Sequence, residues 1–110
     1  MTDPLVREVF LAFWKVHILH HARQRPIYGQ WMTEELERHG FSLSPGTLYP
    51  LLARMEGHGW LKSRREPGAS IKARREYVLT KQGDRALARI RQQVEELHRE
   101  VVLDEKEENA

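Results

Sequence analysis

The chain contains no cysteine, which excludes disulfides and thiolate chemistry. No apolar run approaches the ~18 residues that a membrane-spanning helix needs, and no basic-then-apolar leader opens the sequence. With 110 residues, the chain is long enough for one small domain and hardly for two. These absences predict a soluble, cytoplasmic protein with no membrane partner.

Charge is unevenly distributed along the chain, although the net charge is only +2. Residues 54–91 hold eleven Lys/Arg and four Asp/Glu, whereas residues 92–110 hold two Lys/Arg and seven Asp/Glu. A basic block of this kind indicates an anionic partner. On charge alone, a solvated face balanced by an acidic tail is an equally good interpretation.

Helical spacing of apolar residues, together with proline and glycine positions, predicts three helices in the first half of the chain. They span residues 4–23, residues 28–39, and residues 45 to about 57–59. Asp3 is expected to cap the first helix and Ser44 the third, since both types accept hydrogen bonds from free N–H groups.

The second half of the chain changes pattern. Residues 60–66 and 73–80 are predicted strands, joined by a turn over residues 67–72 into a β-hairpin. A last helix over residues 81–103 follows, capped by Thr80. The order α-α-α-β-β-α is mainly α with a small β-hairpin, which is the plan of a winged helix-turn-helix.

We predict three functional regions from this order. Residues 1–80 form the winged helix-turn-helix DNA-binding domain, whose first helix also contacts a dimer partner. Residues 81–103 form a long C-terminal dimerisation helix, and residues 104–110 form an acidic, frayed tail.

The third predicted helix has small residues at its start and apolar residues at its end. In a helix-turn-helix, the second helix enters the DNA major groove by its N-terminal end, where small side chains let the backbone approach. Free N–H groups and the helix dipole favour phosphate there. An ordinary capped surface helix would show the same motif. The candidate DNA-contacting residues of this helix are Ser44, Pro45, Gly46, Thr47 and Tyr49.

The predicted hairpin is cationic, and a cationic wing can straddle the DNA backbone or reach into the minor groove. A bare helix start followed by a cationic hairpin is a two-part signal that favours DNA binding. The candidate wing residues are Arg64, Arg65, Lys72, Arg74 and Arg75.

The last predicted helix carries an apolar heptad seam with alternating steps of three and four residues. Such a stripe can pack on its own domain, but it is also typical of a short coiled-coil contact between two copies, which we favour. The predicted dimer residues are Leu87, Ile90, Val94, Leu97 and Val101.

Three segments of the sequence resemble the PadR family of bacterial transcriptional regulators. They are YGQWMTEEL at 28–36, SPGTLYPLLARMEGHGWL at 44–61 and ARREYVLTKQG at 73–83. The resemblance covers about residues 15–103, and the single closing helix is similar to the smaller PadR subgroup.

The resemblance implies a winged-helix homodimer that binds a palindrome-like operator in double-stranded DNA, usually as a repressor. It implies DNA contacts from Ser44 to Tyr49 and from the wing between Arg64 and Arg75. It also implies a dimer interface built by the last helix with the first. Several members of the family release DNA when a small aromatic compound binds.

Two further groups of side chains have alternative interpretations. His17 and His21 lie one helical turn apart, with His20 between them, and this spacing suits a shared metal. No carboxylate partner is evident nearby in the sequence, so we expect a mixed core and surface cluster and no metal. A candidate pocket for a planar effector comprises Phe10, Phe13, Trp14 and Trp31, although aromatics at helical spacing usually pack.

Catalysis finds no support, because the histidines lack an evident nucleophile and no glycine-rich loop follows a strand. Glu34, Glu35 and Glu37 are expected on the solvated face of the second helix. We therefore predict a homodimeric transcriptional repressor, with no enzymatic activity and no cofactor. The alternatives are a winged-helix module that binds protein, and a ligand or metal sensor with weak DNA binding.

Overall fold

Residues 3–65 and 74–104 are described by the computed structural model. The predicted turn at 67–72, which includes Lys72, and residues 105–110 of the acidic tail lie outside the described residues. So do the predicted strand ends at Glu66 and Ala73.

The N-terminal helix begins at Pro4 and has two parts. A π-helical turn, η1 (Val6–Phe10), leads into α1 (Leu11–Gln24). The Asp3 carboxylate accepts a hydrogen bond from the Leu5 N–H at 3.0 Å, which confirms the predicted cap. The helix ends where Arg25 becomes extended ahead of Pro26.

A short strand that the sequence did not predict, β1 (Ile27–Tyr28), precedes α2 (Gly29–Arg38). Two residues are too few for a recognisable alternation, so β1 is detected only through its antiparallel pairing with β3. Gly40 has a φ of 88° and ends the turn after α2.

Helix α3 (Pro45–Gly57) matches its prediction, and Gly59, with a φ of 83°, turns the chain into the hairpin. The strands β2 (Leu61–Arg64) and β3 (Glu76–Leu79) are shorter than predicted. The sheet therefore has three strands in the order β1-β3-β2, not the two strands that were predicted.

The last helix, α4 (Lys81–Leu97), continues into the π-helical turn η2 (His98–Val102). The Thr80 hydroxyl accepts a hydrogen bond from the Gly83 N–H at 2.9 Å, which confirms the predicted cap. The Thr80 hydroxyl also donates to the Gly59 carbonyl and so ties the start of α4 to the end of α3.

One hydrophobic core joins α1, α2, α3, the sheet and the first turns of α4. Leu61 and Tyr77 are its inward strand residues, and Leu79 packs against its edge. The buried apolar residues are Trp14, Ile18, Leu19, Ala22, Ile27, Met32, Leu36, Leu43, Leu48, Leu51, Leu52, Met55, Leu61, Tyr77 and Leu87.

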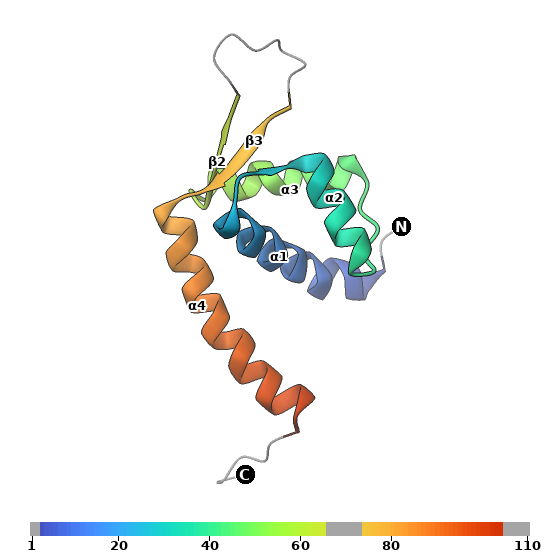
Figure 1. Cartoon of the computed structure of the whole chain (residues 1–110). Coiled ribbons are helices and arrows are strands. Elements are labelled where there is room, and N and C mark those ends of the chain that lie inside the picture. The colour runs from blue at the N-terminus through green and yellow to red at the C-terminus, as the bar shows by residue number, and fades with distance from the viewer. Residues whose placement is uncertain (1–2, 66–73, 105–110) are drawn as a thin grey trace.

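The molecule is elongated, with principal extents of 60 × 35 × 22 Å. We call the β2–β3 hairpin the wing. Helix α3 and the wing lie on one side of α1, whereas α4 extends away on the other side (Figure 1). In the described part of the chain, no helix has the length and apolar character needed to cross a membrane. The mainly helical winged-helix fold predicted from the sequence is confirmed, with β1 as its addition.

Candidate nucleic-acid interface

The N-terminal turn of α3 is exposed from Ser44 to Thr47. Ser44 occupies the predicted cap position, but its hydroxyl lies 3.3 Å from the Thr47 hydroxyl and caps no backbone N–H. The Ser44 carbonyl instead accepts from the Thr47 and Leu48 N–H groups, each at 3.0 Å. The first turn of α3 therefore exposes two hydroxyl-bearing residues together with Gly46, whose N–H has no intrahelical acceptor.

The opposite side of α3 anchors the helix in the core. Leu48, Leu51, Leu52 and Met55 are completely buried. Pro50 lies within the helix and has no N–H to donate to the Gly46 carbonyl, so the first turn keeps free backbone groups of both kinds. The start of α3, with its small residues, is thus exposed to solvent, whereas its apolar residues pack in the core, as predicted.

Tyr49 is held by contact with the first residue of α2. A Cβ on Gly29 would lie 2.6 Å from the Tyr49 ring, so only glycine allows this approach. The tyrosine is nevertheless exposed. On the flank of α3 that faces α2, Glu34 and Glu37 line a hollow with Pro45 and Tyr49.

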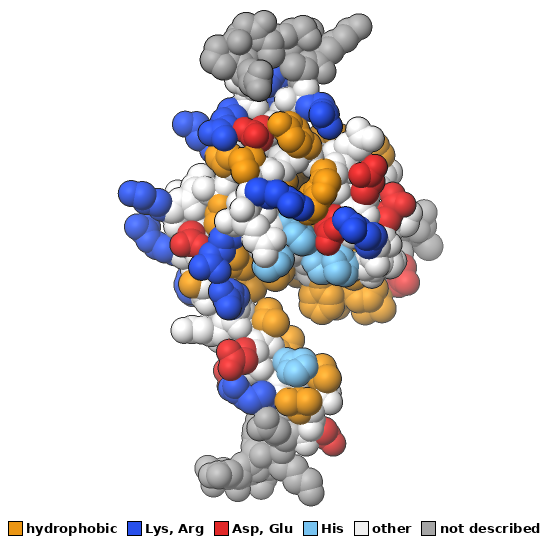
Figure 2. All heavy atoms as spheres, in the orientation of Figure 1, with side chains coloured by type: hydrophobic (Ala, Val, Ile, Leu, Met, Phe, Trp, Pro, Cys, Tyr) orange, Lys and Arg blue, Asp and Glu red, His pale blue; other side chains and the backbone are white. Residues whose placement is uncertain are grey.

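The described wing arginines lie at the end of the hairpin ladder that leads to residues 66–73, but they differ in their partners. Arg64 forms an ion pair with Glu76, its direct partner across the ladder. Arg75 donates to the Ser63 hydroxyl at 3.2 Å, and Arg74 lies over the Tyr28 ring at 4.8 Å. Arg65 is exposed. Lys and Arg side chains cluster around this region in Figure 2.

The predicted heptad seam of α4 divides into two parts. Leu87 is only 3% exposed, so its assignment to a dimer interface is wrong: it packs in the core of its own chain. Ile90 is half-buried against that core. Val94, Leu97 and Val101 are 48%, 53% and 67% exposed, and we call these three residues the apolar end of α4.

A second exposed apolar surface lies on the N-terminal helix. Leu5, Val9 and Phe13 are large side chains that remain exposed along the helix that begins at Pro4. Figure 2 shows hydrophobic side chains both beneath this helix and along α4. The structure therefore exposes apolar surface on the first and last helices, the two elements proposed for dimer contact.

The four residues of the predicted aromatic pocket do not gather into one cluster. Phe10, Phe13 and Trp14 cluster instead with Phe41, which the sequence analysis missed. Trp31 contacts His21 and lies beneath the Arg25 guanidinium. Trp14 Nε1 is buried and has no hydrogen-bond partner in the described part of the chain.

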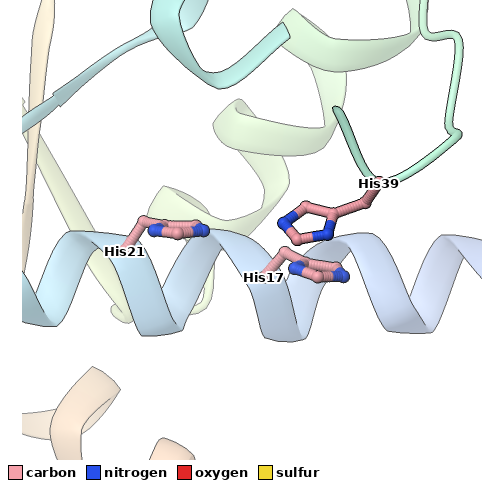
Figure 3. Close-up of side chains that lie close together, drawn as sticks. All are labelled: His17, His21 and His39. Carbon is pink, nitrogen blue, oxygen red and sulfur yellow. The ribbon is translucent and has the colours of Figure 1, made fainter. Parts of the chain in front are cut away.

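The histidine pair of α1 acquires two partners from α2. His39, at the end of α2, stacks on His17 with ring centroids 4.7 Å apart (Figure 3). The Glu35 carboxylate lies 3.4 Å from His21 Nε2. Glu35 is 13% exposed, so its predicted place on the solvated face is wrong. Sequence reasoning missed both residues, although Glu35 and His39 are also one helical turn apart.

Burial lowers the pKa of His17 and of His21, and the neighbouring histidines add to this effect, whereas Glu35 opposes it. Partial burial raises the pKa of the Glu35 carboxyl, but the hydrogen bond with His39 and the charge of Arg38 bring that pKa below its ordinary value. At neutral pH, the cluster therefore consists of neutral α1 imidazoles facing a carboxylate.

Comparison with known proteins identifies relatives across most of the chain. The sequence model of the Transcriptional regulator PadR-like family matches residues 18–89. The Transcriptional regulator Rv3488 of Mycobacterium tuberculosis is 46% identical over 97 residues, which cover 88% of this chain and 90% of the relative.

Solved structures agree in fold. A PadR family transcriptional regulator from Eggerthella lenta is 32% identical, with a TM-score of 0.70 over 96% of each chain. A PadR-like transcription factor from Bacteroides fragilis is 23% identical, with a TM-score of 0.76 over 94% of this chain and 100% of the other, and it supports the fold alone. With the family model matched over more than half of its residues, this chain belongs to the PadR-like family of transcriptional regulators.

Proposed function

We propose that the protein is a homodimeric repressor that binds a palindrome-like operator in double-stranded DNA and has no catalytic activity. The observation that carries this proposal is the exposed N-terminal turn of α3, which lies on the same side of α1 as the arginine-rich wing (Figure 1). A regulator of transcription needs a surface that tells one DNA sequence from another, and this pair of elements offers one.

Helix α3 is the proposed reading element. The hydroxyls of Ser44 and Thr47 can donate to or accept from base edges, and the Thr47 methyl can contact a thymine methyl. The Gly46 N–H and the positive end of the helix dipole favour a phosphate. Because Glu34 and Glu37 flank α3 on its α2 side, we expect the phosphate backbone on the wing side.

The wing supplies sequence-independent attraction. Arg65, Arg74 and Arg75 are exposed at the described end of the wing, and phosphate contacts by arginine release counterions from the duplex. Lys72, which we also propose as a DNA contact, lies outside the described residues. Arg64 contributes less, since Glu76 already neutralises it.

Dimerisation would bring two reading helices onto one operator. The apolar end of α4 and the exposed Leu5, Val9 and Phe13 of the first helix are the proposed contact surfaces. Burying such side chains in a second copy removes them from water. A two-fold dimer presents two equal α3 helices, which matches a palindrome with half-sites about one helical turn apart.

Release by a small aromatic effector belongs to the same proposal. The site we assign to it is the cluster of Phe10, Phe13 and Trp14, extended by Phe41. Trp14 Nε1, which has no partner among residues 3–65 and 74–104, would donate a hydrogen bond to an acceptor on the ligand.

Fluorescence anisotropy with labelled duplexes tests the function. One duplex comes from upstream of the protein's own gene and the other is a shuffled duplex of equal length, each titrated at several salt concentrations. We expect selective binding to the first duplex that weakens steeply with salt, because counterions are released. Equal, weak binding to both would favour a winged-helix module whose partner is an acidic protein surface.

A further inference from the structure

The contact between α1 and the end of α2 brings four potential metal ligands together. His17 and His21 project from the same side of α1 (Figure 3). The residue that follows α2 is His39, and its side chain extends toward them. One nitrogen from each of the three rings lies within 4.8 Å of the other two. The Glu35 carboxylate lies against the same group.

We propose that His17, His21 and His39, with Glu35, form a binding site for a divalent metal ion of the zinc class. Three imidazoles with a carboxylate are ligands typical of Zn²⁺. Four-coordinate zinc places its nitrogen ligands about 3.4 Å apart. We expect the three side chains to rotate and bring their nitrogens to that spacing when an ion binds.

The Glu35 carboxylate faces the imidazoles with one oxygen. Glu35 Oε2 lies 3.4 Å from His21 Nε2 and 3.2 Å from His39 Nε2, so these three atoms already surround a common point. Arg38 pairs with the other oxygen, Oε1, at 2.7 Å. Because Arg38 occupies Oε1, Oε2 stays on the side of the imidazoles, within hydrogen-bond distance of His39 Nε2. From there it can bind an ion directly or orient a ligating imidazole from outside.

The surrounding elements hold the ligands in place without an ion. Ile18 and Leu19 on α1, and Leu36 on α2, are completely buried, so the backbones that carry the ligands are fixed by the core. Gly40 has a positive φ, and Phe41 N–H donates to the Leu36 carbonyl, which closes the chain back over α1 beside His39. His39 lies directly before the connection from α2 to α3, so an ion would tie α1 to the end of α2 ahead of the reading helix.

The electrostatic surroundings suit metal binding. Neutral imidazole is the form that ligates a metal, and the Glu35 carboxylate beside the three rings adds a negative charge that attracts a divalent ion. The cations nearby are Arg38, already paired with Glu35, and Arg25, held over Trp31. His20 lies next to the group in sequence and contacts Gln24, and it is not one of the three.

The proposal is independent of DNA binding and is tested without DNA. The full chain, prepared without a histidine tag, is dialysed against Zn²⁺ and its bound metal is measured. A parallel titration with Co²⁺ reports the ligand field through visible absorption. We expect one ion per chain, and visible bands for Co²⁺ whose intensity indicates a four- or five-coordinate site.

Single substitutions locate the site. His39→Gln is the main variant because His39 is exposed at a helix end, and His17→Gln is the second; both are expected to lose stoichiometric binding. Glu35→Gln is expected to weaken binding about 10- to 100-fold. His58→Gln is the matched control, since His58 is an exposed histidine that contacts Trp60 at the end of α3, and it is expected to bind like the unaltered chain.

Two results would overturn the proposal. One is the lack of saturable Zn²⁺ binding by the unaltered chain, and the other is full binding by His39→Gln and His17→Gln. Circular dichroism establishes that each variant is folded. A rise in Tm with Zn²⁺ in the unaltered chain, and none in folded His39→Gln, is the expected second readout, because an ion bound only by the native state stabilises it.

Discussion

Arg64 on β2 lies directly opposite Glu76 on β3, and the Arg64 guanidinium donates a hydrogen bond to the Glu76 carboxylate. The pair sits at the described end of the wing, where a duplex is proposed to bind. Within the wing, the carboxylate therefore neutralises one arginine and would itself repel a phosphate backbone. The wing arginines therefore differ in how much positive charge they can offer to phosphate, a difference that counting charges in the sequence does not reveal.

Replacing Glu76 with Gln removes that negative charge and frees Arg64. We expect tighter binding to all duplex sequences and a salt slope that steepens by up to about one unit, because one more cation can neutralise phosphate. Anisotropy at several salt concentrations measures both. Glu95→Gln is the matched control, since Glu95, at the exposed end of α4, pairs with Arg99 on η2. Equal gains in both variants would assign the effect to net charge and not to the wing.

Replacing Arg74 with Ala removes a wing cation whose guanidinium stacks on Tyr28 and forms no ion pair among the described residues. We expect weaker binding to all sequences and a salt slope flatter by about one unit. Arg7→Ala, on the N-terminal π-helical turn, is the comparison. An unchanged slope in Arg74→Ala would contradict the assignment of the wing to phosphate contact.

Replacing Thr47 with Ala tests base reading by α3. The change removes an exposed hydroxyl and a methyl, so we expect preference at one operator position to relax by about 1–3 kcal/mol. Competition among duplexes that vary one base pair at a time measures the preference. Thr47→Ser keeps the hydroxyl and is expected to retain hydrogen-bonded readout. The reading assignment fails if Thr47→Ala keeps the full preference profile.

Replacing Leu97 and Val101 together with Asp tests the apolar end of α4. Both side chains are more than half exposed, so the change leaves the core of the chain intact, while paired charges would oppose dimer contact. Sedimentation is expected to show monomers. Ala88→Asp, at an exposed position on the opposite face of α4, is expected to remain dimeric. A dimer that survives the double change would exclude this interface.

Replacing Thr80 with Ala tests the cap of α4. The hydroxyl accepts from the Gly83 N–H and donates to the Gly59 carbonyl. Losing these contacts should lower the free energy of unfolding by about 1 kcal/mol, within the range for N-caps. Urea titration measures the change, and Thr80→Ser is expected to stay near the unaltered stability. A loss of the same size in Thr80→Ser would show that the methyl group, not the hydroxyl, is responsible.

The local elements could be predicted because their causes are local. Asp3 and Thr80 cap helices by accepting hydrogen bonds from N–H groups two and three residues further along the chain. Both partners therefore lie within a few consecutive residues of the sequence. The apolar side of α3 follows from helical periodicity in the same way. The family segments lie in these same elements, and family membership was confirmed over residues 18–89.

Other assignments depend on distances between residues in the folded chain, which the spacing of residues along the sequence does not give. Leu87 and Val101 share one heptad seam, yet one is buried in its own chain and the other is exposed, because α1 and the sheet cover only the first turns of α4. The sequence analysis grouped Trp31 with the aromatic residues of the first helix. In the fold, Trp31 lies beside His21, and Phe41 contacts Trp14 in its place.

The sequence by itself determined the helices, the hairpin and the basic character of the wing, since periodicity, caps and charge are properties of neighbouring residues. Only the tertiary structure decided which arginine is paired, which part of α4 is free, and that Glu35 and His39 meet His17 and His21. The reason is that packing α2 across α1 joins residues that lie 14 or more positions apart, and a contact of this kind depends on the relative placement of two helices.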